Sequence, residues 1–421
     1  MIYLDNSATT RQRREVTEIM VKHMEDTFGN PSSLYQLGVD SEKSVKAARK
    51  QLDAAAGCKS GHICFTSGGT EADNMAIFGA AEALKRRGRR IVTSAVEHPA
   101  VLECCRRLEA EGFEVVYVGV DDKCRLDVSQ LENAINEDTI LVTLMHVNNE
   151  AGTVMPVDEA KKIMRDKNSP GVLHCDAVQS FGKLQMPLEA DLISISGHKI
   201  HGPKGSGALY IRNGINLPAL IVGGGQENGR RSGTENVPAI AGLGLAAEMA
   251  CSDRKSEMKR IADMRKYLID GFGSEIDDII INSPQEAGGG TGQCCPSVLS
   301  VSFLGTRGEV LLHTLEQDGI YVSTGSACSS NKKGQSHVLK AMGLNVPDDI
   351  SVVGYDNHIY STISTPRLTT IDVNSRMMSS EAVDIILHKI RDGNFKRGRT
   401  LVTGKLIRRE SVKNLNAELP V

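Results

Sequence analysis

Short apolar segments alternate with amphipathic segments over about residues 15–255, and this rhythm limits the possible folds more than any other feature of the chain. The apolar segments have the length and composition of buried strands, and the segments between them carry apolar residues at helical spacing. Such alternation is typical of a mostly parallel sheet covered by helices. The expected strands are HICFTS, RRIVTSAV, TILVTLMHV, GVLHCD and DLISISG, and the expected helices include EADNMAIFGAAEALKRRG and VDEAKKIMRDK.

The 421 residues divide into three expected parts of an α/β protein. Residues 15–255 form a large domain with the mostly parallel sheet. Residues 1–14 and 256–344 form a smaller α/β domain, which contains VLSVSFLG, the helix GEVLLHTLEQDG and the small-residue loop STGSACSSNKKGQ. Residues 345–421 form a C-terminal segment with the strands VPDDISVVGYD and LVTGKLIRRESV and the amphipathic helix SSEAVDIILHKIRDG.

Charge and composition favour small molecules or proteins as partners. Forty-nine basic and 52 acidic residues leave a formal charge of -3, which gives no reason to expect nucleic acid or an anionic membrane surface. The N-terminus lacks the apolar core of a secretory signal and no apolar run has membrane-spanning length, so a cytoplasmic location is expected. The ten cysteines contain no C-x-x-C pair, and no metal site is expected.

Two glycine-rich turns carry candidate phosphate ligands. FTSGGTEADN places Thr70 between a strand and a helix start, where backbone N–H groups favour an anion, although such a turn is often only structural. SISGHKIHGPKG ends a strand with Ser196, His198 and Lys199. Its lysine amine is suited to form a Schiff base with a carbonyl cofactor.

Other candidates follow strand-like segments, where the sites of such folds gather. Asp176 ends GVLHCD, and its carboxylate can keep a pyridine nitrogen protonated. His98 in EHPAV is suited to stack on a cofactor ring and to move protons, or it is a hydrogen-bonded histidine at a strand end. Asn149 and Gln179 can donate to a ring oxygen, and each can equally cap a turn.

Cys328 differs from the other nine cysteines because it lies in a loop of glycine and serine followed by Lys332 and Lys333. This setting favours exposure and thiolate character, as a nucleophile on a flexible tether requires. An ordinary surface cysteine is the alternative interpretation.

Taken together, these segments resemble the cysteine desulfurases, a family of pyridoxal 5′-phosphate (PLP) enzymes. The resemblance covers about residues 1–344 and is carried, in order, by YLDNSATT, FGNPSS, FTSGGTEADN, EHPAV, HVNNEAGT, DAVQSFGK, SGHKIHGPKG, GGGQENGRRSGTENV and GSACSS. It implies the PLP-dependent transferase fold type I. The long loop around GSACSS is similar to the class that supplies iron–sulfur cluster assembly and tRNA thiolation.

The resemblance also implies a role for each candidate residue. Lys199 would bind PLP covalently and handle the substrate proton, and His98 would act as acid and base. Cys328 would take sulfur from L-cysteine, giving L-alanine and a persulfide for an acceptor protein, either a scaffold or a thiolation enzyme. The remaining cofactor ligands would be Thr70, Asn149, Asp176, Gln179, Ser196 and His198, with Thr234 reaching the phosphate of the partner subunit in a homodimer.

The sequence departs from this family in two places. Tyr35 stands where the family commonly has histidine, and we attach no function to this change. After KAMGL the family continues with a strand that bears a substrate-carboxylate arginine, whereas residues 345–421 resemble the end of the ligand domain of lactose-repressor-type regulators, as an apparent fusion. Arg367 is the nearest replacement arginine. Alternatives are a selenocysteine lyase, a class V aminotransferase or a catalytically impaired PLP-binding fusion protein.

Overall fold

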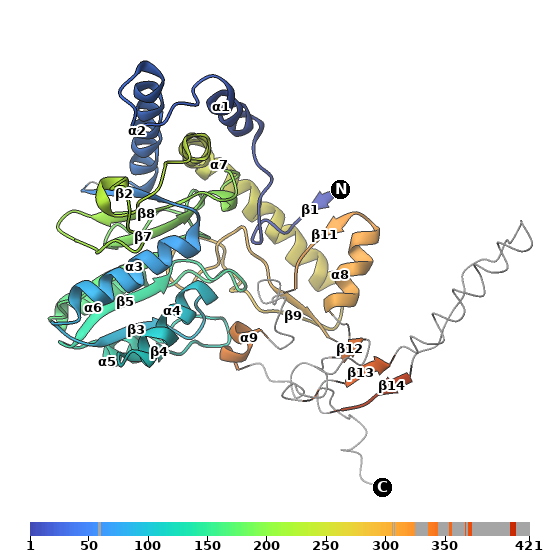
Figure 1. Ribbon diagram of the computed structural model, residues 1–421. Coiled ribbons are helices and arrows are strands. Elements are labelled where there is room, and N and C mark those ends of the chain that lie inside the picture. Colours follow the sequence, from blue (N-terminus) through green and yellow to red (C-terminus); the bar gives the residue numbers. More distant parts are fainter. Residues whose placement is uncertain are drawn as a thin grey trace, which may run out of the picture.

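The computed structural model describes residues 1–57, 60–304, 306, 308–324, 336–343, 353–355, 367, 369–372 and 405–409. Its largest unit is a seven-stranded sheet with the order β2-β8-β7-β6-β5-β3-β4 (Figure 1). Strand β8 is antiparallel to both of its neighbours, and the other adjacent pairs are parallel. The strands are β2 (Gly61–Thr66), β3 (Arg90–Ser94), β4 (Glu114–Val118), β5 (Thr139–Met145), β6 (Val172–Asp176), β7 (Leu192–Ser196) and β8 (Gly207–Arg212).

Helices cover both faces of this sheet. On one face, α3 (Gly69–Leu84) and α4 (Pro99–Ala110) bury a cluster that includes Met75, Ile77 and Val101. The larger apolar core contains the opposite helices α1 (Arg14–Glu25), α2 (Gln36–Ala56), α5 (Val128–Ala134), α6 (Val157–Asp166) and the first part of α7 (Val237–Glu275).

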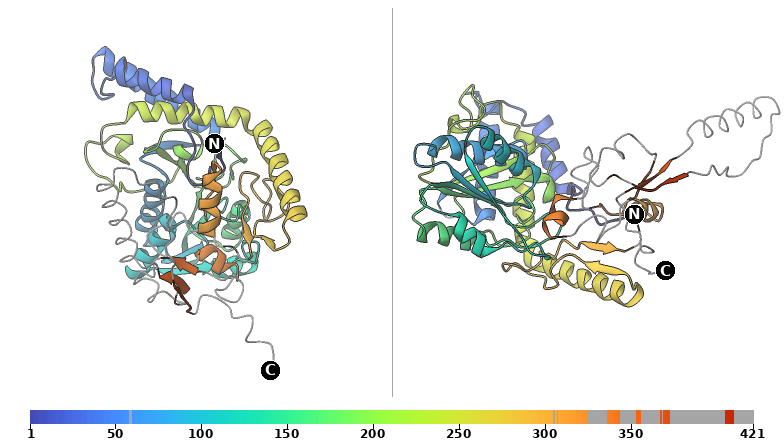
Figure 2. Two further views of the ribbon diagram at one scale, coloured as in Figure 1. Left: turned by 90° about the vertical axis from the view of Figure 1, so that its right-hand side faces the viewer. Right: turned by 90° about the horizontal axis from the view of Figure 1, so that it is seen from below.

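The remaining elements lie beyond the end of the large sheet. The long helix α7 leaves the sheet and reaches a hairpin-like pair, β9 (Ile279–Ile281) and β10 (Val301–Phe303), as the two views of Figure 2 show. Buried Arg265 on α7 fixes this contact by donating hydrogen bonds to three backbone carbonyls. Helix α8 (Gly308–Gln317) follows, as expected from GEVLLHTLEQDG.

The N-terminal segment pairs with residues far along the chain. Strand β1 (Ile2–Tyr3) is parallel to β11 (Ile320–Tyr321), and the Ser323 hydroxyl donates to an oxygen of Asp5 at 2.6 Å. After α9 (His337–Ala341), three short strands form a separate sheet in the order β12-β13-β14. These strands are β12 (Val353–Tyr355), β13 (Thr369–Asp372) and β14 (Lys405–Ile407), and the helix expected from SSEAVDIILHKIRDG lies outside the described residues.

Candidate functional site

The predicted site residues lie where strands of the large sheet end. Asp176 is the last residue of β6 and Ser196 is the last residue of the neighbouring strand β7. Lys199 follows in the short helix η1 (Gly197–Lys199), and Thr70 lies in the first turn of α3. The carboxyl ends of adjacent parallel strands share one edge of the sheet, so the fold brings these side chains together.

Lys199 is buried against the N-terminal segment of the chain. Its Nζ donates hydrogen bonds to the backbone oxygens of Ser7 and Ala8, the latter at 2.9 Å. The same segment accepts a bond from Gln179 Nε2 at the Ser7 oxygen, at 3.0 Å. Sequence reasoning gave Ser7 and Ala8 no role, because they act through backbone oxygens, and the motif YLDNSATT was the only signal that this segment matters.

Asp176 provides a buried carboxylate with few partners. Its Oδ1 accepts from the backbone N–H of Val178 at 2.9 Å. Burial raises the pKa of Asp176, while the backbone hydrogen bond, His98 and Lys199 oppose this rise. A carboxylate in this state gains most from a cationic N–H donor, such as a protonated pyridine nitrogen.

A pocket of about 400 Å³ lies between the start of α3 and the turn after β7. Its lining includes Gly68, Gly69, Thr70, Ser196 and His198. A side chain on Gly69 would meet the Val178 side chain at 2.7 Å, so this cradle requires glycine. Hydroxyl groups, a helix N-terminus and glycine backbone fit a phosphate group, and the pocket suits the phosphate end of PLP.

His198 is held beside this pocket by the N-terminal segment. Its Nδ1 lies 3.1 Å from Thr9 Oγ1, and its backbone oxygen accepts from the Thr10 hydroxyl at 2.9 Å. Burial, with help from Lys199 and Lys204, lowers the pKa of His198 to about 4. A neutral imidazole with one free nitrogen remains for a ligand.

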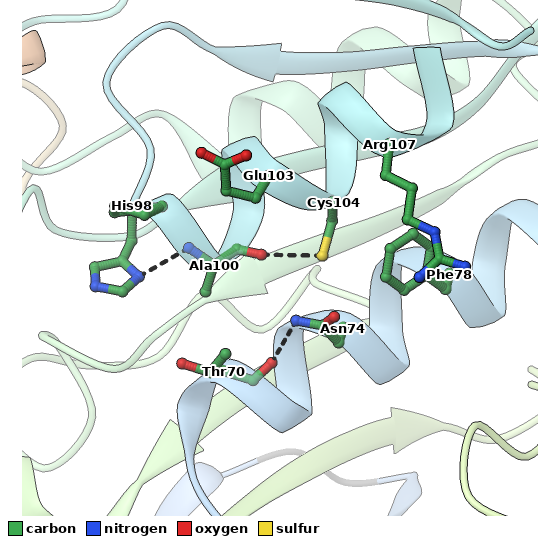
Figure 3. Close-up of a pocket in the computed structure, with 9 residues that line it drawn as sticks. Thr70, Asn74, Phe78, His98, Ala100, Glu103, Cys104 and Arg107 are labelled. Carbon is green, nitrogen blue, oxygen red and sulfur yellow. Dashed lines mark hydrogen bonds between the residues drawn. The ribbon is translucent and has the colours of Figure 1, made fainter. Parts of the chain in front are cut away.

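His98 is the N-cap of α4, and its Nδ1 accepts from the backbone N–H of Ala100 at 3.1 Å. Burial lowers the pKa of His98, with further effects from Asp176, Lys199 and His337. The cap therefore places the proton of the neutral ring on Nε2. His98 and Thr70 line a second pocket of about 440 Å³ between α3 and α4 (Figure 3).

Two predicted ring-oxygen ligands differ in their surroundings. Gln179 is buried, and its Oε1 accepts from Lys183 Nζ at 3.4 Å, which leaves its amide oriented by two contacts. Asn149 is half-buried and makes no side-chain hydrogen bond within the described part of the chain.

The neighbour of Asn149, Asn148, is fully buried and stabilises the turn by accepting hydrogen bonds from the backbone N–H groups of Glu150 and Ala151. Sequence reasoning missed this structural role, because the two adjacent asparagines look alike in the sequence.

Thr234 is exposed, as a residue that reaches a partner subunit would be. The segment before it is tied by two ion pairs to helices α2 and α3, which cover the large sheet. Glu227 in the short helix η2 (Glu227–Gly229) pairs with Arg49 at 2.8 Å, and Arg231 pairs with Glu71 at 2.8 Å.

Cys328 lies outside the described residues. The nearest described residues on its C-terminal side contact the large sheet unit: Ser336 Oγ donates to Glu150 Oε2 at 2.5 Å, and His337 Nε2 lies 2.9 Å from the backbone oxygen of Glu97. Glu150 and Glu97 are direct neighbours of Asn149 and His98 in the sequence. Ser336 and His337 therefore lie against the segments that carry two of the candidate site residues.

The family model for aminotransferase class-V matches residues 2–345, and the chain belongs to this family. Membership of the family, together with the similarities below, confirms the predicted fold type I and the predicted dependence on PLP. A second model, the periplasmic binding protein-like domain, matches residues 332–412.

Among curated relatives, the chain is similar to the cysteine desulfurase IscS of Dictyoglomus turgidum, with 44% identity over 353 residues, 83% of this chain and 87% of that protein. It is also similar to IscS of Methanosarcina thermophila, with 42% identity over 394 residues, 93% of each chain. A solved NifS-like protein has a TM-score of 0.75 and 39% identity over 82% of this chain and 90% of that one. The apo cysteine desulfurase of Thermococcus onnurineus has a TM-score of 0.73 and 26% identity, covering 82% and 88%.

The described residues contain neither a membrane-spanning helix nor a metal-binding cluster. None of their helices is long and apolar enough to cross a membrane. Within the same residues, no group of three or more His, Cys, Asp or Glu side chains is arranged to hold a metal ion.

Proposed function

We propose that the chain is a cysteine desulfurase that converts L-cysteine to L-alanine and leaves the sulfur as a persulfide on Cys328. The observation that carries this proposal is the placement of a buried lysine, Lys199, and a buried carboxylate, Asp176, at the ends of adjacent strands beside a glycine-rich pocket. The similarity to IscS proteins over more than four-fifths of the chain supports the same activity.

In this proposal each site residue has a defined role. When bound, PLP supplies the electron sink for breaking bonds at the substrate carbon. Lys199 binds the cofactor covalently and then moves the substrate Cα proton, and Asp176 pairs with the ring nitrogen. His98 stacks on the ring and exchanges a proton through Nε2.

The remaining ligands orient the cofactor. Asn149 and Gln179 contact the ring oxygen. Thr70, Ser196 and His198 hold the phosphate, for which their placement around the pocket gives support.

Cys328 completes the reaction without any external oxidant or reductant. Its thiolate forms a bond to the substrate sulfur while the carbon–sulfur bond breaks, and the carbon receives a proton. One thiol and L-cysteine thus become one persulfide and L-alanine. The persulfide sulfur then passes to an acceptor protein of iron–sulfur cluster assembly or tRNA thiolation.

A homodimer fits the same site, with Thr234 of each chain reaching the phosphate held by the other. The segment between α1 and α2 supports an interface, because Phe28, Leu34 and Tyr35 are 65%, 98% and 61% exposed. Exposed apolar groups of this size are typical of contact surfaces. A cytoplasmic location remains our inference for the assembled enzyme.

We also infer the division into a large domain of residues 15–255, a small domain of 1–14 with 256–344, and a segment 345–421 related to repressor-type ligand domains. The match of the periplasmic binding protein-like model supports the last part. This segment replaces the family's substrate-carboxylate arginine, and Arg367, which is exposed, is the nearest candidate to take its place.

The activity is tested with purified protein, by visible absorbance of the lysine-bound cofactor and by sulfide and alanine formation from L-cysteine. Lys199→Ala removes the cofactor attachment and Cys328→Ser removes the sulfur acceptor. Cys251→Ser is the matched control, because Cys251 is a half-buried cysteine outside the site.

A coloured protein whose sulfide release depends on Lys199 and Cys328, and not on Cys251, is the expected result. A coloured protein without sulfide release would contradict the activity and assign the failure to the replaced arginine segment. A colourless protein would overturn the cofactor site itself.

A further inference from the structure

A row of buried polar side chains lies beneath Asp176, on the face of the sheet that α3 covers. His174 is two residues before Asp176 on β6 and therefore points to the same face. Ser194 on β7 is the register partner of Asp176, and Thr143 on β5 is the register partner of His174. Asp73 on α3 completes the row, and all four side chains other than Asp176 are at most 2% exposed.

These side chains form one hydrogen-bonded chain. Thr143 Oγ1 lies 2.8 Å from His174 Nδ1, and His174 Nε2 lies 2.9 Å from Ser194 Oγ. Ser194 also neighbours Asp73 and lowers the pKa of its carboxyl group. Asp73 Oδ1 is 3.6 Å from His174 Nε2 and has no hydrogen-bond partner among the described residues.

Among the described residues, the electrostatic neighbours of Asp73 are mostly acidic. Asp176, Glu97 and the thiols of Cys104 and Cys175 interact with it, and His174 is its basic neighbour there. Burial lowers the pKa of His174 to about 3, so this imidazole is neutral at physiological pH. No lysine or arginine forms an ion pair with Asp73 in the described part of the chain.

The hydrogen-bond partners around Asp73 favour its protonated state over its ionised state. An ionised Asp73 would leave a buried, charged oxygen without a donor, which is one of the most costly arrangements in a protein interior. A protonated Asp73 donates to Ser194, Ser194 donates to His174 Nε2, and His174 Nδ1–H donates to Thr143. Each of these three donors then has an acceptor, and the Oδ1 without a donor is a neutral carbonyl oxygen.

We propose that Asp73 is a positioning residue that stays protonated beneath the cofactor site, so that Asp176 carries the negative charge that faces the cofactor ring nitrogen. The ring-nitrogen part rests on the function proposed above. His98 and Lys199 favour the charged form of Asp176, whereas Asp73 has no lysine or arginine partner among the described residues, so Asp73 is the carboxyl group that keeps its proton. Burial and the charge of Asp176 raise the pKa of Asp73, in agreement with this assignment.

The protonation state is tested directly by infrared difference spectroscopy at neutral pH between the unchanged protein and Asp73→Asn, each with and without PLP. The expected result is a carbonyl band of a protonated carboxylic acid that Asp73→Asn lacks. Glu97→Gln is the matched control, because Glu97 is a second buried acid whose pKa burial raises to about 8, and its band should be separate. Equal acid bands in the unchanged protein and in Asp73→Asn would overturn the proposal.

Cofactor affinity gives the second measurement, by absorbance titration with PLP. Asp73→Asn keeps a neutral side chain of the same shape and should change the dissociation constant by less than about threefold, whereas Asp176→Asn should weaken binding roughly 100-fold. Equal losses in both variants would overturn the inference. Failure of the unchanged protein to bind PLP would instead overturn the proposed function, and the infrared result without PLP would still decide the state of Asp73.

Discussion

Replacing Glu227 with glutamine tests whether one buried ion pair holds the segment that leads to Thr234. The Glu227 side chain is 4% exposed, and its two oxygens accept from Arg49 Nη1 and Nη2 at 2.9 and 2.8 Å. One oxygen also accepts from the backbone N–H of Phe65 at 3.0 Å. Glu227 itself has φ +50°, a left-handed conformation that these contacts stabilise.

The expected loss of unfolding free energy in Glu227→Gln follows from the contacts that Arg49 and Phe65 keep or lose. Glutamine keeps an acceptor for Phe65 but presents an amide to Arg49, whose guanidinium then loses its counter-charge. Breaking a buried pair on one side costs about 3–5 kcal/mol, and the 25% exposure of the Arg49 side chain favours the lower end. About 3 kcal/mol in the large domain of residues 15–255 corresponds to a fall in Tm of roughly 6 °C or more.

Thermal and urea unfolding of Glu227→Gln measure this loss, and Glu18→Gln is the matched control because its pair with Arg14 is exposed. The control should change stability by less than about 0.5 kcal/mol. A double-mutant cycle with Arg49→Met should give a coupling of about 2 kcal/mol. A Glu227→Gln protein as stable as the control, or a coupling near zero, would refute the argument.

Three further outcomes are expected. Burial raises the pKa of Glu97 from 4.5 to about 8, so between these pH values the unfolded chain loses this proton while the folded chain keeps it, and the folded state becomes less stable as the pH rises. From pH 5 to 8 the unchanged protein should therefore lose on the order of 3 kcal/mol more stability than Glu97→Gln. Parallel pH curves of the two proteins in urea unfolding would contradict this. Gly69→Ala should weaken PLP binding about tenfold, because its Cβ would meet Val178 at 2.7 Å, and an unchanged dissociation constant would exclude the close contact. Ser336→Ala removes the N-cap of α9 and the hydrogen-bond donor to Glu150, so backbone hydrogen exchange in α9 should become about fivefold faster. An unchanged exchange rate would show that the cap does not stabilise α9.

The sequence predicted the parts of the fold that have a local signal. The expected strands GVLHCD and DLISISG are β6 and β7, and they end at Asp176 and Ser196 as expected. Their apolar runs and the polar residue that follows each run carry this information within a few positions. The same local signals located the turns that carry Thr70 and Lys199.

Contacts between distant segments could not be predicted in this way. The two-residue strands β1 and β11 have no recognisable pattern, and they form because the tertiary structure brings them together. Likewise His174 and Asp73 look like ordinary strand and helix residues in the sequence. Their hydrogen-bonded row depends on strand order and on the position of α3, which periodicity does not determine.

The pairing of β1 with β11 also sets an order of events during synthesis. The first strand leaves the ribosome early, but Asp5 must wait for Ser323, which follows it by 318 residues. The large sheet is complete at Arg212, so it can assemble while the first residues remain unpaired. We therefore expect nascent chains stopped before residue 320 to leave the strand Ile2–Tyr3 without its partner and open to fast hydrogen exchange.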